Sequence, residues 1–346
     1  MLRPLHGFAL LSLGIAAACA TVPPAITGDP TVSVTARAET PPVGTANADA
    51  ADDPAIWRNA ADPAASLIVG TDKKGGLYVY NLKGEQVSFL AAPGLNNVDL
   101  IQTGASIWIV ASDRSDLATA HLSITLFHPW KLEFDATQRV PVGPGEGYGL
   151  CLGMLASDGS FTAFSAPKNG VIYQTRISEG HHGDAIAESS VLASVPSQPE
   201  GCVVDDRTGT LYVGEEAAGI WAIDIATGSK EIVAPVGTGM LVADVEGLAI
   251  APEGKDGGYL VASSQGDNAY AVYRLPGMEP LGRFRIAAGA FGATEETDGI
   301  ALDPRDFGPD FPGGLFIAQD GINPPRAQNF KYVRWDDVLA ALEGGR

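Results

Sequence analysis

The stretch VEGLAIAPEGKDGGYLVASSQGDNAYAVYRL, from Val245 to Leu275, contains the pattern that predicts the fold. An acidic residue and a glycine lead a short apolar run, and two further apolar runs follow with a polar turn between them. Runs of this length, rich in Val, Ile and Tyr and separated by turn residues, are typical of β-strands. The stretch therefore predicts three consecutive strands, the first of which begins at an acidic residue.

The same unit recurs five more times along the chain. Its leading run recurs as DDPAIW at Asp52, LNNVDLI at Leu95, GYGLCL at Gly147, PEGCVV at Pro199 and TDGIAL at Thr297. Its hairpin recurs from Leu67, Ile107, Phe161, Leu211 and Leu315. The polar residues that follow the first strand of each hairpin lie 40, 54, 48, 49 and 55 residues apart; they are Lys74, Arg114, Lys168, Glu216, Gln265 and Asp320. Because a propeller blade takes about 40–50 residues, we predict an all-β, six-bladed β-propeller with four-stranded antiparallel blades around a central channel.

The two ends of the chain are expected to close this ring. VSVTARAE at Val32 and FKYVRW at Phe330 are both strand-like, and one blade shared by the two termini would complete the circle. We therefore assign residues 31–346 to a single propeller domain, with a short helix over 336–346.

The first residues read as an export signal. Arg3 is followed by the apolar stretch from Phe8 to Ala18, which is too short to span a membrane as a helix. We predict a signal peptide over 1–19 and a linker over 20–30, and an exported protein that is periplasmic, secreted or an outer-membrane lipoprotein. Cys19 is either lipidated, which would give the only membrane attachment, or removed with the signal. Cys151 and Cys202 form either a disulfide or two buried thiols, and we expect a monomer.

The net charge of −19 disfavours a nucleic-acid-binding protein, which normally has a basic surface. An acidic chain is either simply soluble or gathers carboxylates to hold hard cations such as Ca²⁺. The chain lacks an Arg-His-Gly motif, a Cys followed by five residues and Arg, and a Gly-rich phosphate loop, so several phosphatase chemistries are excluded.

Propeller geometry predicts where the charges meet. The innermost strand of a blade starts at the face to which the second strand returns, so both motif positions converge on one mouth of the channel. The oxygen ligands expected there are Asp52, Asp53, Asn96, Asn97, Asp99, Glu200, Glu215, Glu216, Asp244, Glu246, Gln265, Asp298 and Asp320. The expected cations are Lys73, Lys74, Arg114 and Lys168. Calcium prefers such oxygens, calcium and the cations together attract phosphate, and a metal-bound water offers a nucleophile.

These motifs, together with TDKKGGLYVY from Thr71, GLFIAQDG from Gly314 and QNFKYV from Gln328, resemble the β-propeller phytases in the same order over almost the whole chain. The resemblance implies a calcium-dependent enzyme that binds several calcium ions and releases phosphate from phytate (myo-inositol hexakisphosphate), attacking the 3-phosphate first by means of a calcium-bound water. It also implies two neighbouring phosphate sites.

The resemblance carries roles over to individual residues. The calcium-binding acids around the cleaved phosphate match Asp52, Glu200, Glu216, Glu246 and Asp298. The phosphate-binding residues match Lys73, Arg114, Tyr148, Lys168 and Asn329, and Lys74 is expected beside them. Glu39 matches a further acid near the mouth, and Asn97 and Asp99 match a second, more structural calcium site.

Two other functions remain alternatives at this stage. A calcium-bound six-bladed lactonase or phosphotriesterase needs few ligands around one metal, and the several mouth cations argue against it. A non-catalytic periplasmic binding propeller would bind phytate without turning it over.

Overall fold

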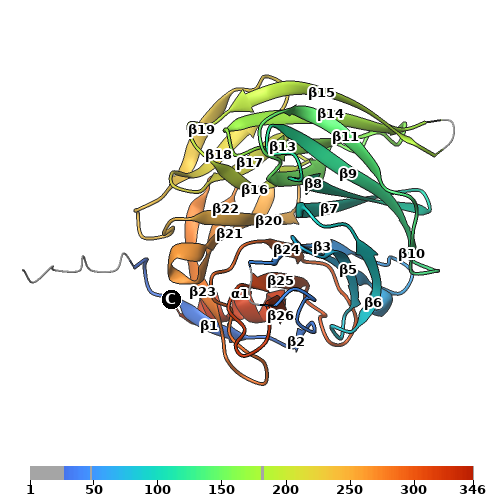
Figure 1. The fold of residues 1–346 in the computed structure, drawn as a ribbon. Coiled ribbons are helices and arrows are strands. Elements are labelled where there is room, and N and C mark those ends of the chain that lie inside the picture. Colours follow the sequence, from blue (N-terminus) through green and yellow to red (C-terminus); the bar gives the residue numbers. More distant parts are fainter. Residues whose placement is uncertain (1–26, 47–48, 181–182, 346) are drawn as a thin grey trace, which may run out of the picture.

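The computed structural model describes residues 27–46, 49–180 and 183–345. Its strands form six sheets arranged in a ring (Figure 1), so the predicted six-bladed, all-β propeller is confirmed. The predicted signal peptide, Cys19 and residues 20–26 of the predicted linker lie outside the described residues. In the part of the chain that the structure describes, no helix is long and apolar enough to cross a membrane.

Each blade contains four antiparallel strands. In the first five blades the innermost of these four comes first in the chain, and in the sixth the outermost strand comes from the N-terminal segment. The first blade is β3 (Ala51–Trp57), β4 (Leu67–Asp72), β5 (Gly76–Asn81) and β6 (Gln86–Ala91). The second is β7 (Leu95–Thr103), β8 (Ser106–Asp113) and β9 (Thr119–His128), with β10 (Glu133–Phe134) and β11 (Gln138–Pro144) both paired to β9. The third is β12 (Gly149–Gly153), β13 (Phe161–Ala166), β14 (Val171–Glu179) and β15 (Ala185–Ser194).

The remaining three blades follow the same order. The fourth is β16 (Pro199–Asp205), β17 (Thr210–Glu215), β18 (Gly219–Asp224) and β19 (Lys230–Pro235). The fifth is β20 (Val245–Glu253), β21 (Gly257–Ser264), β22 (Ala269–Leu275) and β23 (Glu279–Ala287). The sixth is β24 (Ile300–Asp303), β25 (Leu315–Asp320), β26 (Asn329–Arg334) and β2 (Ala38–Glu39). Short 3-10 helices lie at Pro63–Ala65 and Gln265–Asp267.

The N-terminal segment closes the ring in two steps. β2 pairs antiparallel with β26 and completes the sixth blade. β1 (Val32–Thr35) instead adds to the edge of β23 as a parallel fifth strand of the fifth blade. The prediction of one shared blade is therefore right for Ala38–Glu39 and wrong for Val32–Thr35, because the chain passes from one blade to the next at Ala36 and Arg37.

The predicted C-terminal helix is present as α1 (Trp335–Gly344). Its buried residues Trp335, Val338 and Leu342 belong to the same apolar core as Val34 of β1 and Phe284 of β23. The helix therefore packs the two chain ends onto the propeller, beside the fifth blade (Figure 1).

The innermost strands carry a recurring irregularity at the mouth. The pairing register shifts between Ala51 and Pro54, and at the corresponding places in β7, β16 and β20. The residues in these shifts are Asp52-Asp53, Asn96-Asn97, Glu200-Gly201 and Glu246-Gly247. Because a β-bulge redirects side chains out of the ladder, the repeated polar residues face the mouth instead of the blade interior.

In the fourth, fifth and sixth blades a glycine follows the acid and allows neighbouring innermost strands to meet. A Cβ atom on Gly201 would lie 2.2 Å from the carbonyl oxygen of Glu246, and one on Gly299 would lie 2.1 Å from Asp53 Oδ1. No larger residue fits at this distance without moving backbone. The Glu-Gly and Asp-Gly pairs are thus positions of close strand approach.

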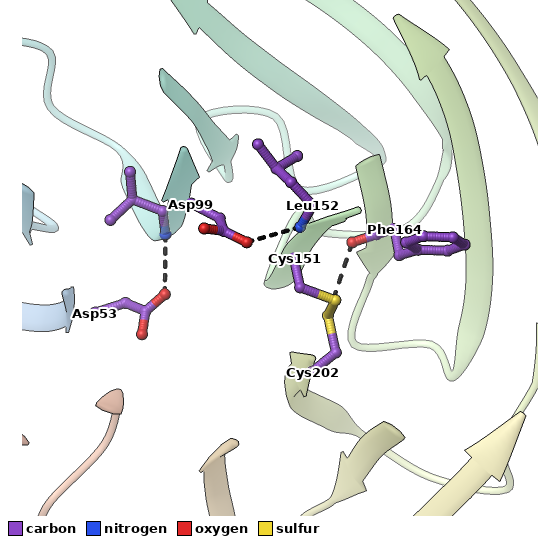
Figure 2. The surroundings of a disulfide bond; sticks show 7 residues. Asp53, Asp99, Cys151, Leu152, Phe164 and Cys202 are labelled. Atoms are coloured by element: carbon purple, nitrogen blue, oxygen red, sulfur yellow. Dashed lines mark hydrogen bonds between the residues drawn. A yellow bond between two sulfur atoms is a disulfide. The ribbon is translucent and has the colours of Figure 1, made fainter. Parts of the chain in front are cut away.

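A disulfide joins Cys151 of β12 to Cys202 of β16, the innermost strands of two adjacent blades (Figure 2). The two Cα atoms are 5.6 Å apart, within the usual range for a bridge. Of the two alternatives that the sequence left open, a disulfide or two buried thiols, the structure has the disulfide. The cross-link spans 51 residues and so encloses the third blade.

Replacing both cysteines (C151A/C202A) should lower the free energy of unfolding by about 4 kcal/mol, because a cross-link over a loop of this length restricts the unfolded chain. Guanidinium denaturation at fixed calcium measures the change. Reduction of the wild-type protein should cause a loss of similar size, and the reductant should leave the double variant unaffected. An unchanged denaturation midpoint in the reduced wild-type protein would rule out this stabilising role.

Candidate active site at the mouth of the channel

Three glutamates bring their carboxylates together at the mouth. Glu200 and Glu246 lie in the bulges of β16 and β20, and Glu216 directly follows β17. One oxygen from each of the three lies within 4.8 Å of the other two. Glu200 and Glu246 are each only 4% exposed. Three predicted ligands from two adjacent blades thus form a single cluster.

Lys73 connects two more of the predicted acids to this cluster. Its Nζ lies 2.9 Å from Asp52 Oδ1 and 3.5 Å from Asp298 Oδ2. Gln265 Nε2 donates a hydrogen bond of 2.6 Å to Asp298 Oδ1. The charge of Glu200 acts on both Asp52 and Asp298. We call the five acids of this site, Asp52, Glu200, Glu216, Glu246 and Asp298, the mouth acids.

The carboxylates of the mouth acids are buried and repel one another when no metal is bound. Burial, followed by the charge of neighbouring carboxylates, raises the pKa of four of them: Asp52, Glu216, Glu246 and Asp298. For Glu216 the pKa rises to about 7. Burial alone would lower the pKa of Lys73, but Asp52 and the other nearby carboxylates outweigh it and raise that pKa, so the ammonium stays charged. One ammonium does not neutralise five carboxyl groups.

The burial and mutual repulsion of these carboxylates predict how pH affects the calcium-free protein. The pKa of Glu216 lies at about 7 in the folded protein against an ordinary 4.5, so the folded state binds more protons than the unfolded chain between these values. Stability should therefore fall as pH rises through this window. Thermal unfolding in a chelator should give a higher melting temperature at pH 5 than at pH 8, with a smaller difference in E216Q. Greater stability at pH 8 would contradict the assignment.

Buried oxygens that lack hydrogen-bond donors show where a cation fits. Oδ2 of Asp52 and Oε2 of Glu246 are buried and accept no hydrogen bond, whereas Oδ1 of Asp52 faces the Lys73 ammonium at 2.9 Å. Such oxygens usually have a donor or a metal as partner. The donor set consists of carboxylates and the Gln265 amide, and calcium takes about 6–8 oxygens of these kinds. The mouth acids therefore fit a hard divalent cation.

The cations predicted to bind phosphate flank the mouth acids. Lys74 is exposed and, with Lys73 and Arg114, lines a surface depression of about 510 Å³. The ring centre of Tyr148 lies 5.3 Å from the Arg114 guanidinium carbon and 4.4 Å from Lys168 Nζ. Arg114, Tyr148 and Lys168 thus form one cluster, as their repeated positions predict.

Asp53, Asn97 and Asp99 line a cavity of about 180 Å³ among the innermost strands. Asp53 Oδ2 accepts a hydrogen bond of 3.0 Å from the Val98 amide, and Asp99 Oδ2 accepts one of 2.8 Å from the Leu152 amide (Figure 2). Each of these aspartates therefore ties its strand to the next innermost strand. Burial raises the pKa of Asp99 to about 6. A second calcium site at Asn97 and Asp99 stays a prediction.

Two further predicted metal ligands, Glu215 and Asp244, have different surroundings. Glu215 is buried in its blade, where Oε1 accepts a hydrogen bond of 2.6 Å from the Ser197 amide and Oε2 one of 2.7 Å from Trp221 Nε1. Both carboxylate oxygens of Glu215 are therefore bound by donors of the protein, and its side chain is buried. Asp244 precedes β20, and its charge acts on Glu216. The structure brings Asp244 to the mouth acids and leaves Glu215 apart from them.

Glu39 and Asn329 surround a buried lysine of the sixth blade. Lys331 Nζ lies 2.7 Å from Glu39 Oε2, 3.0 Å from Asp320 Oδ2 and 2.7 Å from Asn329 Oδ1. Arg326 binds the other oxygen of Glu39 at 3.0 Å. Lys331 thus neutralises these acids. Metal binding by Glu39 and phosphate binding by Asn329 stay predictions.

Two acids at positions that the repeat does not predict hold the mouth cations. Asp49 Oδ1 lies 2.9 Å from Lys73 Nζ, and Glu146 Oε1 accepts hydrogen bonds from Arg114. Neither occupies a repeated position, since Asp49 precedes DDPAIW by three residues and Glu146 precedes GYGLCL by one. The one feature of the sequence that could have indicated these two residues is an acid just before a predicted mouth strand.

Known proteins share both the sequence and the architecture. The Phytase family model matches residues 5–345. A 3-phytase of Bacillus subtilis (strain 168) is 37% identical over 328 residues, which cover 89% of this chain and 85% of that protein. The solved structure of regucalcin, a calcium-binding protein from Agrobacterium tumefaciens str. C58, matches 88% of this chain and 97% of its own with a TM-score of 0.55. Its identity is 12%, so that likeness concerns the fold alone. Because the family match covers nearly the whole chain, including the mouth acids and their flanking cations, this protein belongs to the phytase family.

Proposed function

We propose that this member of the phytase family hydrolyses phytate in a calcium-dependent reaction, releasing inorganic phosphate and lower inositol phosphates. One observation carries the proposal: five acids, some with buried oxygens that have no donor, stand beside Lys73, Arg114 and Lys168 at a single mouth. Without a metal these acids would repel phosphate. With several calcium ions held among them, the mouth becomes attractive to a polyanion.

Different residues at the mouth would have different roles in this reaction. Glu200, Glu216 and Glu246 would hold calcium, which when bound supplies positive charge for phosphate oxygens and lowers the pKa of a coordinated water. The Arg114 guanidinium offers a fork of donors that matches phosphate oxygens. Lys73 is fixed between Asp52 and Asp298, so its charge is already in place when negative charge develops on the cleaved phosphate.

Purified protein tests this proposal when it is incubated with phytate and excess calcium. Phosphate release should stop with a chelator and return when calcium is restored. Release that persists in the chelator would overturn the calcium mechanism. Turnover of a lactone or of a phosphotriester without turnover of phytate would favour the lactonase alternative, and an intact phytate complex would favour the binding propeller.

Three finer points belong to the same proposal. The relative is named a 3-phytase, so we propose that the 3-phosphate leaves first, which identification of the first product by NMR tests. The apolar stretch Phe8–Ala18 supports export, and mass spectrometry of the mature N-terminus distinguishes lipidation at Cys19 from signal cleavage. A single monomeric species is expected in size-exclusion chromatography with light scattering.

A further inference from the structure

Glu146 occupies the cationic cluster in which phosphate is expected to bind. It lies between β11 and β12, and its side chain is 19% exposed. Its Oε1 accepts hydrogen bonds from both Nε and Nη2 of Arg114, and the same oxygen lies 3.5 Å from Lys168 Nζ. A single carboxylate oxygen of Glu146 therefore accepts two hydrogen bonds from Arg114 and also lies close to the charge of Lys168.

Other contacts hold these cations independently of Glu146. Arg114 Nη1 donates a hydrogen bond of 3.0 Å to Asn96 Oδ1, and both cations lie over the ring of Tyr148. Asn96 is fully buried and donates in turn to Glu200 Oε1 at 3.3 Å. Arg114 thus stays anchored to the mouth acids when Glu146 loses its charge.

We propose that Glu146 is an internal competitor of substrate phosphate and sets the selectivity of the site for polyphosphates. This inference rests on the proposed function. The carboxylate occupies the donors of Arg114 and Lys168 in the free protein, and a phosphate group binds there only by displacing it. Glu146 therefore acts on substrate binding through the two cations and is a specificity-determining residue.

The competition weakens the binding of a single phosphate more than that of phytate. The cluster of Arg114, Lys168 and Glu146 carries a net charge of about +1, which rises to about +2 when the glutamate is neutralised. Inorganic phosphate has no second phosphate group to hold it at the mouth, so it must displace Glu146 as a free ion. A phosphate of phytate is held near the cluster by its neighbours on the same ring, which raises its effective concentration. Glu146 should therefore limit inhibition by the phosphate product.

The test compares E146Q with the wild-type protein and two controls, all loaded with calcium. E146D keeps the charge, and E188Q removes one charge from an exposed position on β15. The inhibition constant of inorganic phosphate is measured during phytate hydrolysis, and its dissociation constant by calorimetry. We expect both constants to fall by about tenfold in E146Q, with a smaller fall in the KM for phytate. Both constants should stay within about twofold of wild type in E188Q and should change less in E146D than in E146Q.

The measured constants for inorganic phosphate can also contradict the proposed role of Glu146. Constants for inorganic phosphate that are unchanged or higher in E146Q would overturn the inference, because a merely structural glutamate would loosen the cations. E146A gives a second test, with the same expected direction. A wild-type protein that releases no phosphate from phytate would instead refute the proposed function, and calorimetry with inorganic phosphate would still test Glu146.

Discussion

Replacing Glu200 with glutamine should lower phosphate release from phytate by on the order of 10²–10³-fold and at the same time stabilise the calcium-free protein. The charge of Glu200 acts on all four of the other mouth acids. In addition to burial, it raises the pKa of Asp52, Glu216, Glu246 and Asp298. Glutamine keeps the shape and the hydrogen-bond acceptor for Asn96 while it removes this repulsion. The same change therefore relieves the repulsion and removes a proposed metal ligand.

Thermal unfolding with and without calcium separates the two effects. Calcium at 100 times its dissociation constant should stabilise the wild-type protein by about 2.7 kcal/mol, and E200Q should gain much less at the same concentration. E188Q removes one charge from an exposed position on β15, the outermost strand of the third blade, and should behave as wild type in both conditions. An E200Q protein that is fully active, or less stable than wild type in a chelator, would show that Glu200 has been misassigned.

Replacing Lys73 with methionine should lower the free energy of unfolding by about 3–5 kcal/mol in the calcium-free protein. The Lys73 side chain is 5% exposed and lies against Asp52 and Asp298, so its loss leaves buried carboxylates without a counter-charge. Phosphate release should fall as well, because the same ammonium faces the expected position of the cleaved phosphate.

The adjacent lysine provides the matched control. Lys74 is exposed, and its replacement with methionine should change the free energy of unfolding by less than about 0.5 kcal/mol. Calcium should recover part of the stability of K73M by neutralising the same acids. Equal effects of K73M and K74M on urea denaturation would contradict the role given to Lys73.

The repeat made most of the acidic site predictable. Six copies of one unit define which residue begins each innermost strand, and propeller geometry converts that position into a place at the mouth. Glu200, Glu246 and Asp52 were found in this way. The pattern does not distinguish a mouth residue from its neighbour at the end of a strand. Glu215 was therefore grouped with Glu216, although its buried carboxylate binds the Ser197 amide and Trp221 Nε1.

Three other acids owe their places to long-range contacts, which the repeat does not indicate. Asp49 meets Lys73 across 24 residues, Glu146 meets Arg114 across 32, and Glu39 meets Lys331 across 292. None of these acids has counterparts in the other blades, so a repeat cannot locate them. The passage of the N-terminal segment across two blades likewise depends on which sheet edges are free once the ring has formed.

Long-wavelength anomalous diffraction from crystals grown with calcium tests the central claim most directly. The mouth acids are predicted to give an anomalous peak about 2.3–2.6 Å from carboxylate oxygens of Glu200, Glu216 and Glu246, and the peak should be lost in E200Q crystals. A well-ordered mouth with no peak at these glutamates, in crystals saturated with calcium, would contradict the account.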